Sequence, residues 1–209
     1  MTGYGTVEEM LVGEDGEAVM GPLPRLRARL SAAAAGEGLL DVAYCTIDTP
    51  IGSLLLAATP DGLVRIALPN EDQERVLAEL AVRISPRILN APSRFDQAAR
   101  EIGEYLSRSR RSFDLAIDLR LASGFRRSVL RQLLEIEYGA TASYAQVAAA
   151  SGNPRAVRAV GSACATNPLP LVVPCHRVLR SDGTLGGYAG GLQLKRRLLE
   201  LEGQSEAGQ

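Results

Sequence analysis

The sequence predicts an α+β fold, with a small antiparallel sheet and its helices in the first half and a mainly helical second half. Between residues 41 and 69, three apolar and partly alternating runs are separated by TPIG and PDG, whose proline and glycine favour tight turns. From residue 124 onward, apolar residues recur at helical spacing instead. Residues 1–40 mix glycine with acidic residues, and we expect a largely disordered extension with one helical segment near residues 25–35.

The first half is expected to form three antiparallel strands and two helices. The strands are the runs VAYCTID, SLLLAAT and LVRIALP. Apolar residues at intervals of three and four predict helices over residues 70–84 and 93–107. The alternating run FDLAIDL, residues 113–119, either returns to the sheet or forms the connection to the second half. We interpret this half as a scaffold.

The second half contains the pattern of a helix-turn-helix. One helix is expected over residues 125–136, and Ser143 is placed to cap the next, over 144–150. SGNP then forms a turn, with Pro154 in the first turn of a helix that continues through 156–165. The second helix of such a pair normally enters a DNA groove. Its mostly small side chains cannot distinguish base edges, so low sequence specificity is expected.

The net charge of −1 argues at first against a nucleic-acid partner, but the charge is unevenly distributed. Residues 119–203 hold 11 basic and 5 acidic side chains, a net charge of +6, whereas residues 1–118 hold 12 and 18, a net charge of −6. Attraction to phosphate acts over a Debye length of about 8 Å, so the basic half can bind DNA.

The stretch LVVPCHRV, residues 171–178, is the main candidate for chemistry. Its apolar start predicts a buried, extended segment that ends at Pro174. Cys175 is followed by His176, the one histidine of the chain, and by Arg177. A thiol with a pKa of about 8.5 is mostly un-ionised at neutral pH and becomes nucleophilic when a base takes its proton. The adjacency of Cys175 and His176 is equally compatible with a structural role, in which the thiol is a small buried side chain beside a histidine of the core.

The cysteine and histidine content restricts the class of protein. Cys45, Cys164 and Cys175 are the three cysteines; they form no CxxC pair and are too few for a disulfide framework, which favours a reducing compartment. With one histidine and no cysteine cluster, a zinc site would lack ligands, so we expect no metal site. We also expect no cofactor. The acidic start MTGYGTVEEM has no apolar core, so we expect no signal peptide and no membrane span, and a cytoplasmic location.

From Ile117 to Gly203 the motifs SY, GNPRAVRAVG, NP, PCHRV, GGYAGG and LLxLEG follow one another in a characteristic order and spacing. In these motifs the chain resembles the O6-alkylguanine-DNA alkyltransferases, and DTPIGSLLLAATPDGLVRI resembles the start of their amino-terminal domain. The resemblance implies a ribonuclease H-like domain followed by a winged-helix-like DNA-binding and active-site domain. The implied divisions are an extension (1–40), the amino-terminal scaffold domain (41–119), the DNA-binding and alkyl-acceptor domain (120–203) and a tail (204–209).

The resemblance also implies a reaction: direct-reversal repair of O6-alkylguanine, and of O4-alkylthymine as an open alternative, in duplex DNA. Cys175 would accept a methyl or small alkyl group irreversibly, so each molecule would act once. The implied relay runs from Glu202 through His176 and a bridging water to Cys175. Tyr144 would push against the phosphate of the flipped nucleotide and protonate the leaving guanine.

Further residue roles follow from the same resemblance. Arg158 would fill the gap left in the base stack when the guanine is flipped out through the minor groove. The implied DNA-contacting residues are Tyr144, Arg155, Ala156, Arg158, Ala159 and Gly161. The implied pocket and hinge residues are Cys164, Asn167, Val178, Tyr188, Ala189 and Gly190. Asn167 would tie the recognition helix to the active-site segment, and Cys164 would be a wall residue rather than a second nucleophile.

Three positions depart from the family pattern. Ala189 stands where Ser is common, which removes a possible hydrogen bond to the guanine oxygen. Leu130 replaces a common Trp and Glu137 a common Pro, both at structural positions. Two other classes of protein remain possible: a non-catalytic lesion-binding module of the alkyltransferase-like kind, which lacks the acceptor cysteine, and a cysteine hydrolase using Cys175 and His176. The expected protein is a monomer.

Overall fold

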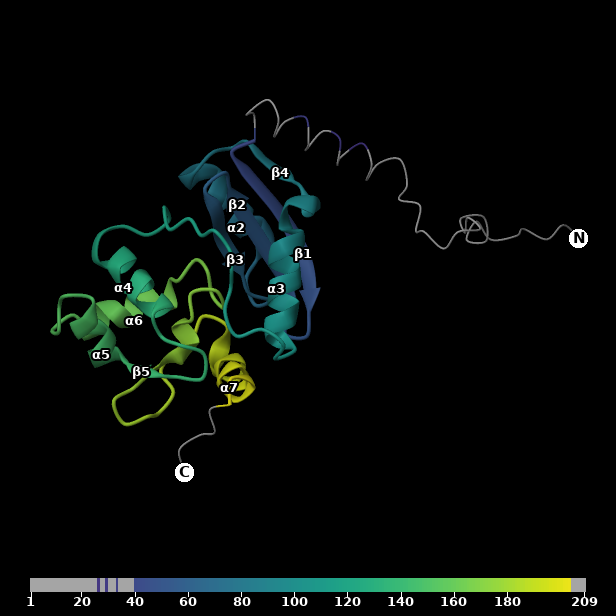
Figure 1. The fold of residues 1–209 in the computed structure, drawn as a ribbon. Coiled ribbons are helices and arrows are strands. Elements are labelled where there is room, and N and C mark those ends of the chain that lie inside the picture. Colours follow the sequence, from purple (N-terminus) through teal and green to yellow (C-terminus); the bar gives the residue numbers. More distant parts are fainter. Residues whose placement is uncertain (1–25, 27–28, 30–32, 34–39, 204–209) are drawn as a thin grey trace, which may run out of the picture.

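The computed structural model describes residues 26, 29, 33 and 40–203. Most of the expected segment near residues 25–35 lies outside these residues, as does the tail 204–209, and the described Leu26, Arg29 and Ala33 are helical. Figure 1 shows a sheet with its helices beside a mainly helical second half, so the predicted α+β class is confirmed. The elements of the first half are β1 (Val42–Thr49), β2 (Gly52–Thr59), β3 (Gly62–Ala67), α2 (Gln73–Arg83), β4 (Ile88–Asn90), the 3-10 turn η2 (Pro92–Phe95) and α3 (Asp96–Leu106).

The sheet has the strand order β3-β2-β1-β4. β1 to β3 pair antiparallel as predicted, with registers such as Thr46↔Leu55 and Leu56↔Ile66. The fourth strand was not predicted. β4 is three residues long and pairs parallel with β1, in the register that places Ile88 opposite Val42.

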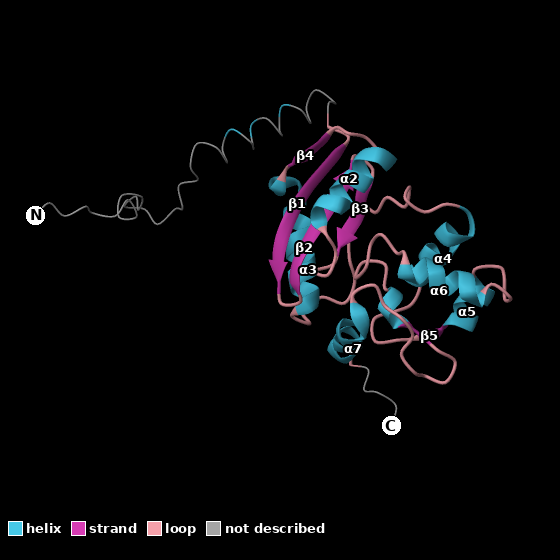
Figure 2. Cartoon of the chain, turned by 180° about the vertical axis from the view of Figure 1, so that it is seen from behind, coloured by secondary structure: helices cyan, strands magenta, loops and turns pink. Residues whose placement is uncertain are grey.

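Alternation along the strands gives the sheet two buried faces, one packed against α2 and the other against α3 and part of the second half. Val42, Leu55 and Val64 face α2, which contributes Val76 and Leu80. The opposite residues of the same strands face α3 and join the main core. Figure 2 shows α2 in front of the strands and α3 behind them.

Both predicted helices of this half are shorter than expected. The first begins at Gln73 rather than at 70, because the side chain of Asp72 caps it by accepting from the N–H groups of Glu74 and Arg75. The second starts as the 3-10 turn η2, which has Pro92 at its first position, before becoming α3 at Asp96.

The run at 113–119 forms the connection between the halves and is hydrogen-bonded to the sheet, mainly through the backbone of Leu63. Leu63 N–H donates to Ala116 O at 2.8 Å, and Asp118 N–H donates to Leu63 O at 2.8 Å. Leu63 and Ile117 form an isolated parallel bridge. The connection is thereby anchored at the start of β3.

The second half comprises α4 (Gly124–Leu134), β5 (Ala142–Ser143), α5 (Tyr144–Ala150), α6 (Val157–Ala165), the 3-10 turn η3 (Cys175–Arg177), β6 (Val178–Leu179) and α7 (Gly191–Leu201). Ser143 caps α5 as predicted, in a capping box completed by the side chain of Gln146. Pro154 was placed wrongly in the first turn of α6. It lies in the preceding turn, and α6 starts at Val157 with Ala156 as its N-cap.

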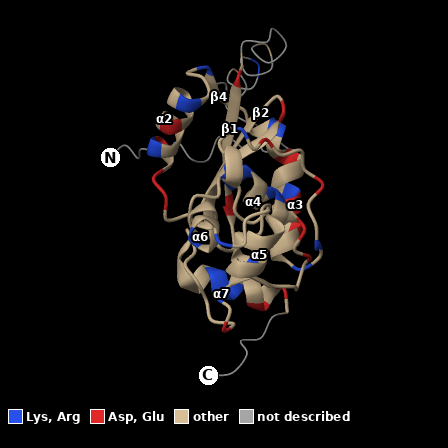
Figure 3. Ribbon diagram, turned by 90° about the vertical axis from the view of Figure 1, so that its left-hand side faces the viewer, with Lys and Arg blue, Asp and Glu red and all other residues tan. Residues whose placement is uncertain are grey.

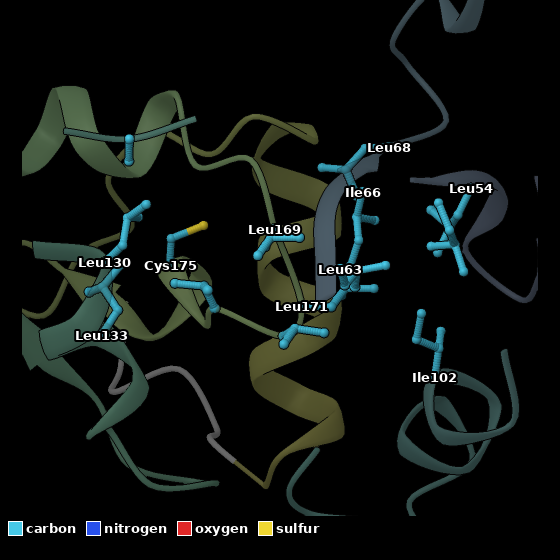
Figure 4. Packing of buried hydrophobic residues seen from close by; sticks show 14 of the residues in the cluster. Leu54, Leu63, Ile66, Leu68, Ile102, Leu130, Leu133, Leu169, Leu171 and Cys175 are labelled. Carbon is cyan, nitrogen blue, oxygen red and sulfur yellow. The ribbon is translucent and has the colours of Figure 1, made fainter. Parts of the chain in front are cut away.

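Residues 171–174 are buried as expected but form turns, so the predicted extended conformation is wrong. Pro168, Pro170 and Pro174 cannot donate backbone hydrogen bonds, and Leu171 has a φ of 74°, which breaks any strand. Leu169 and Leu171 instead fill the space between the halves. Figure 4 shows them between the side chains of β3 on one side and Cys175 with Leu130 on the other. No helix among the described residues is long and apolar enough to cross a membrane.

The anchoring of the connection predicts a cost for replacing Gly62. This residue has a φ of 138°, and an added Cβ would strike the carbonyl of Ala116. Gly62→Ala should lower the free energy of unfolding by more than about 2 kcal/mol, since strain and a backbone clash combine. Gly183→Ala is the matched control, because its φ is 81° and its Cβ would meet open space. Urea unfolding of both variants checks the prediction; an equal loss in the two would contradict the clash.

Candidate active site around Cys175

Cys175 opens the turn η3, directly after Pro174, and is 2% exposed. Its Sγ accepts a hydrogen bond from Asn167 Nδ2 at 3.1 Å. The same amide donates to Val173 O at 2.8 Å, and its Oδ1 accepts from Leu169 N–H at 3.0 Å. Asn167 thus joins the end of α6 to the segment that carries the thiol.

The thiol is protonated at rest. Burial raises the pKa of Cys175 to about 11, although the hydrogen bond from Asn167 and the charge of Lys195 oppose the rise. At neutral pH a thiol with that pKa is ionised in roughly one molecule in 10⁴. A nucleophilic role for Cys175 therefore requires a base that removes the proton during the reaction.

His176 is fully buried and is held through one ring nitrogen. Its Nε2 lies 3.0 Å from Glu202 Oε1, while Nδ1 has no hydrogen-bond partner. Burial lowers the pKa of His176 despite the favourable contact with Glu202, so the ring is neutral at pH 7. An ionised carboxylate only accepts hydrogen bonds, so the proton of the neutral ring is on Nε2, and Nδ1 carries the lone pair of a base. No direct hydrogen bond joins the ring to Cys175.

Glu202 follows α7 as its C-cap, and its side chain is fully buried. Arg177 donates to it from Nε at 2.9 Å and from a terminal nitrogen at 2.8 Å, and Gly139 N–H donates at 3.2 Å. The Tyr105 hydroxyl donates at 2.6 Å. Burial alone would raise the pKa of Glu202, but the hydrogen bonds from His176, Arg177 and Tyr105 outweigh it and lower the pKa to about 2. The carboxylate is therefore ionised.

Tyr144 is placed beside this centre by strand pairing. The short strands β5 and β6 pair Ala142 with Val178, so the first residue of α5 lies near the residues after Cys175. The Tyr144 hydroxyl lies where a Cβ on Gly186 would be, so that position accepts only glycine while the tyrosine keeps its place. Burial, with the nearby cysteines, raises the pKa of Tyr144, so its hydroxyl keeps its proton at neutral pH.

Lys195 is a site residue that the sequence analysis missed. It is fully buried on α7, and its Nζ donates to Val178 O at 2.6 Å and to Gly186 O at 3.4 Å. The ammonium also lies 6.0 Å from the centre of the Tyr144 ring. Burial lowers its pKa, and its charge favours the thiolate of Cys175. A signal existed, because Lys195 precedes the buried Leu198 and Leu199 by three and four residues, on the apolar face of α7.

The GGYAGG loop, residues 186–191, closes over the histidine. The Tyr188 ring meets the His176 ring edge-on at 6.5 Å, and the Tyr188 hydroxyl is buried without a hydrogen-bond partner. The amino-terminal half holds the loop, since Asn70 Nδ2 donates to Ala189 O at 2.9 Å. Gly190 packs against Leu68 of the same half.

The exposed face of α6 lies apart from the thiol. Val160, Ala163 and Cys164 are buried, and burial raises the pKa of Cys164 to about 12. Arg155, Arg158 and Ala159 are exposed, whereas Ala156 and Gly161 are half-buried. Arg158 is the one charged residue of α6, whereas Figure 3 shows both signs of charge on α2.

The predicted site residues thus separate into two groups. The buried centre is formed by Cys175, His176, Glu202, Asn167, Tyr144, Cys164, Val178 and the 188–190 loop. The exposed group, at the start of α6 and just before it, consists of Arg155, Arg158 and Ala159. A cleft of about 610 Å³ lies elsewhere, between the halves, and borders the segment only at Leu171, Val172, Pro174 and Arg177. It does not contain the thiol. Among the described residues, no group of three His, Cys, Asp or Glu side chains is arranged to hold a metal ion.

Two family models match the chain and together cover most of it. The "6-O-methylguanine DNA methyltransferase, ribonuclease-like domain" matches residues 42–119, and the "6-O-methylguanine DNA methyltransferase, DNA binding domain" matches residues 124–204. These matches define the class of protein as a 6-O-methylguanine DNA methyltransferase.

Curated relatives and a solved structure agree with this class. The methylated-DNA--protein-cysteine methyltransferase of Methanosarcina barkeri is 39% identical over 76% of this chain and 96% of its own. The bifunctional transcriptional activator/DNA repair enzyme Ada of Escherichia coli is 40% identical over 82% of this chain, which spans only 48% of Ada. A crystal structure of Mycobacterium tuberculosis OGT in complex with DNA is 37% identical, with a TM-score of 0.68 over 77% of this chain and 93% of that one. The chain belongs to the 6-O-methylguanine DNA methyltransferase family.

The buried carboxylate predicts a specific dependence of stability on pH. The folded pKa of Glu202 is about 2, below its ordinary value of 4.5, so the ionised form contributes stability above pH 4.5 that is lost as the pH falls towards 2. Glu202→Gln should lower the free energy of unfolding at pH 7 by on the order of 3 kcal/mol. Below pH 4.5 the difference from the parent protein should shrink.

Urea unfolding between pH 3 and pH 7 measures this difference. The control is Glu200→Gln, an exposed glutamate on the same helix, which should stay within about 0.5 kcal/mol of the parent protein. A Glu202→Gln penalty that does not change with pH would contradict the assignment of an ionised, hydrogen-bonded carboxylate.

Proposed function

We propose that this chain repairs DNA by transferring a methyl or small alkyl group from O6 of guanine in duplex DNA to Cys175, once per molecule. The observation that carries the proposal is the buried Cys175 thiol, which accepts from Asn167 and lies beside a neutral histidine whose Nδ1 is free and whose Nε2 is held by Glu202.

The proposed proton path begins at the thiol. His176 Nδ1 takes the Cys175 proton through a bridging water, while Glu202 holds the ring and balances the charge of the imidazolium. Lys195 and Asn167 stabilise the developing thiolate, since their donors and charge favour its ionised form. The hydrogen bond from Asn167 and the charge of Lys195 both lower the free energy needed to ionise the Cys175 thiol, whose pKa is about 11.

The alkyl group then moves in a single displacement. The sulfur electron pair forms a bond to the alkyl carbon as the carbon–O6 bond breaks, and its electrons pass into the guanine. Tyr144 supplies a proton to the leaving base, which becomes ordinary guanine. The product is a thioether, which offers no acyl carbon for water to attack. The relay therefore cannot regenerate Cys175, and one turnover per molecule follows.

The proposed DNA contact is made by the exposed face of α6, together with Tyr144. This face carries Arg158 between small residues, which allows close approach in the minor groove and gives little sequence specificity. The guanine must leave the stack, because Cys175 is 2% exposed and cannot be reached by a stacked base. Arg158 would occupy the gap that the base leaves.

Entry of the base requires the GGYAGG loop to move. Tyr188 packs edge-on against His176 and its hydroxyl lacks a partner, so displacing it breaks no hydrogen bond of that group. Ala189 leaves only backbone groups to meet the guanine oxygen. We propose the domain division at residue 119 and a monomeric state as parts of the same model, with residues 41–119 as the scaffold and residues 120–203 as the acceptor domain.

The acceptor assignment is tested with duplex DNA carrying labelled O6-methylguanine, followed by peptide mapping. The parent protein should incorporate about one label per molecule, on the Cys175 peptide. Cys175→Ala should incorporate none yet still bind DNA, because only the sulfur is removed. Cys45→Ala is the matched control and should transfer normally. Label on another residue, or many products per molecule as from a hydrolase, would overturn the proposal.

The role of Arg158 is tested by comparing two substrates. Arg158→Ala should slow repair of duplex DNA by at least about tenfold, since extruding a base costs a few kcal/mol, and leave the reaction with free O6-benzylguanine nearly unchanged. Arg75→Ala, which removes an exposed arginine from α2, should affect neither. Equal slowing on both substrates would exclude a role in base extrusion.

A further inference from the structure

Tyr105 brings a hydroxyl from the amino-terminal half into the centre of the active site. It lies on α3, fully buried, with its ring 5.1 Å from that of Phe113 and edge-on to that of Tyr138 at 6.1 Å. Its hydroxyl lies 2.6 Å from Glu202 Oε1 and 3.3 Å from His176 Nε2. The helical spacing of apolar residues over 93–107 predicts that the Tyr105 ring is buried, but not what its hydroxyl contacts.

The direction of this hydrogen bond follows from the two acidities. The pKa of Glu202 is about 2, so the carboxylate only accepts. Burial, together with the charge of Glu202, raises the pKa of Tyr105, so the phenol keeps its proton and donates it. His176 Nε2–H points at the same Oε1. Glu202 Oε1 therefore accepts from the phenol of the amino-terminal half and from the imidazole and guanidinium of the second half.

We propose that Tyr105 is a positioning residue for alkyl transfer, because its hydroxyl fixes Glu202 Oε1 and thereby the tautomer and orientation of His176. The inference rests on the proposed function only for the role of His176 as the base. The amino-terminal half is then more than a scaffold: it supplies one hydrogen bond to the relay.

The charged and titratable groups around the imidazole define what loss of this hydroxyl does. Glu202 and Arg177 contact one another beside the ring, and Tyr188 meets it edge-on. The charges of Arg177 and of Lys195 on α7 oppose its protonation. Tyr105 is the phenol that disperses negative charge from Oε1. Without it the carboxylate is more basic and favours the imidazolium more strongly, so the pKa of His176 rises.

The test compares Tyr105→Phe with Tyr138→Phe. Tyr138 belongs to the same aromatic cluster, but its hydroxyl donates to Leu201 O at 3.0 Å and not to Glu202, so it is a matched control for loss of a partly buried phenol. His176 is the one histidine of the chain, so ¹⁵N-histidine labelling gives a single imidazole whose tautomer and pKa are followed by NMR.

The expected results distinguish the two variants. In Tyr105→Phe the imidazole pKa should rise, and transfer from O6-benzylguanine should slow by about tenfold at neutral pH. The rate should also begin to fall at a higher pH on acidification, because the base is protonated earlier. DNA binding should be unchanged. Tyr138→Phe should keep the imidazole signals and the rate of the parent protein.

The inference is overturned if Tyr105→Phe leaves the imidazole shifts, the pKa and the rate as they are in Tyr138→Phe. If Tyr105→Phe does not fold, the test uses 3-fluorotyrosine labelling in a Tyr188→Phe background instead. The fluorinated phenol of Tyr105 is more acidic and should lower the pKa of His176; an unchanged pKa would exclude the positioning role of Tyr105.

Failure of the proposed function looks different. The parent protein then transfers no label, while the titration of the imidazole still decides whether Tyr105 controls His176.

Discussion

The carboxylate of Glu202 is the group on which the arrangement of the site depends. A charge buried in a protein interior is costly unless hydrogen bonds satisfy it, and here they come from separate parts of the chain. Tyr105 donates from α3, Gly139 from the loop after α4, and His176 and Arg177 from η3. Satisfying this one group therefore fixes the end of α7, the active-site turn and the amino-terminal half relative to one another.

Local patterns were sufficient to predict most of the fold. The alternating strands and the Ser143 cap depend on neighbouring residues alone, and both are confirmed. β4 was missed because three residues carry too little periodicity, and its conformation depends on pairing with β1. The buried run at 171–174 was taken as extended because its residues are apolar. The three prolines around it and the positive φ of Leu171 make it a series of turns instead.

The site was predictable where a motif places residues side by side and unpredictable where tertiary contacts decide. Cys175 and His176 are adjacent in the sequence, and Glu202 entered through the resemblance. Tyr105 was expected only to pack, because helical spacing shows which face is buried but not what a phenol oxygen meets there. Lys195 was overlooked because it was counted only among the basic side chains of residues 119–203. Its Nζ instead donates to Val178 O inside the protein.

Burial gives the centre a thiol that is both protected and unreactive. A pKa of about 11 keeps Cys175 protonated, and a side chain that is 2% exposed meets few solutes, so adventitious alkylation or oxidation is slow. For a protein proposed to act once, protection of the sulfur between encounters matters more than resting nucleophilicity. Activation then has to coincide with arrival of the substrate. The loop that carries Tyr188 is hydrogen-bonded to the amino-terminal half through Asn70, and Glu202 is hydrogen-bonded to the same half through Tyr105. Movement of the loop and orientation of His176 therefore both depend on the interface between the two halves.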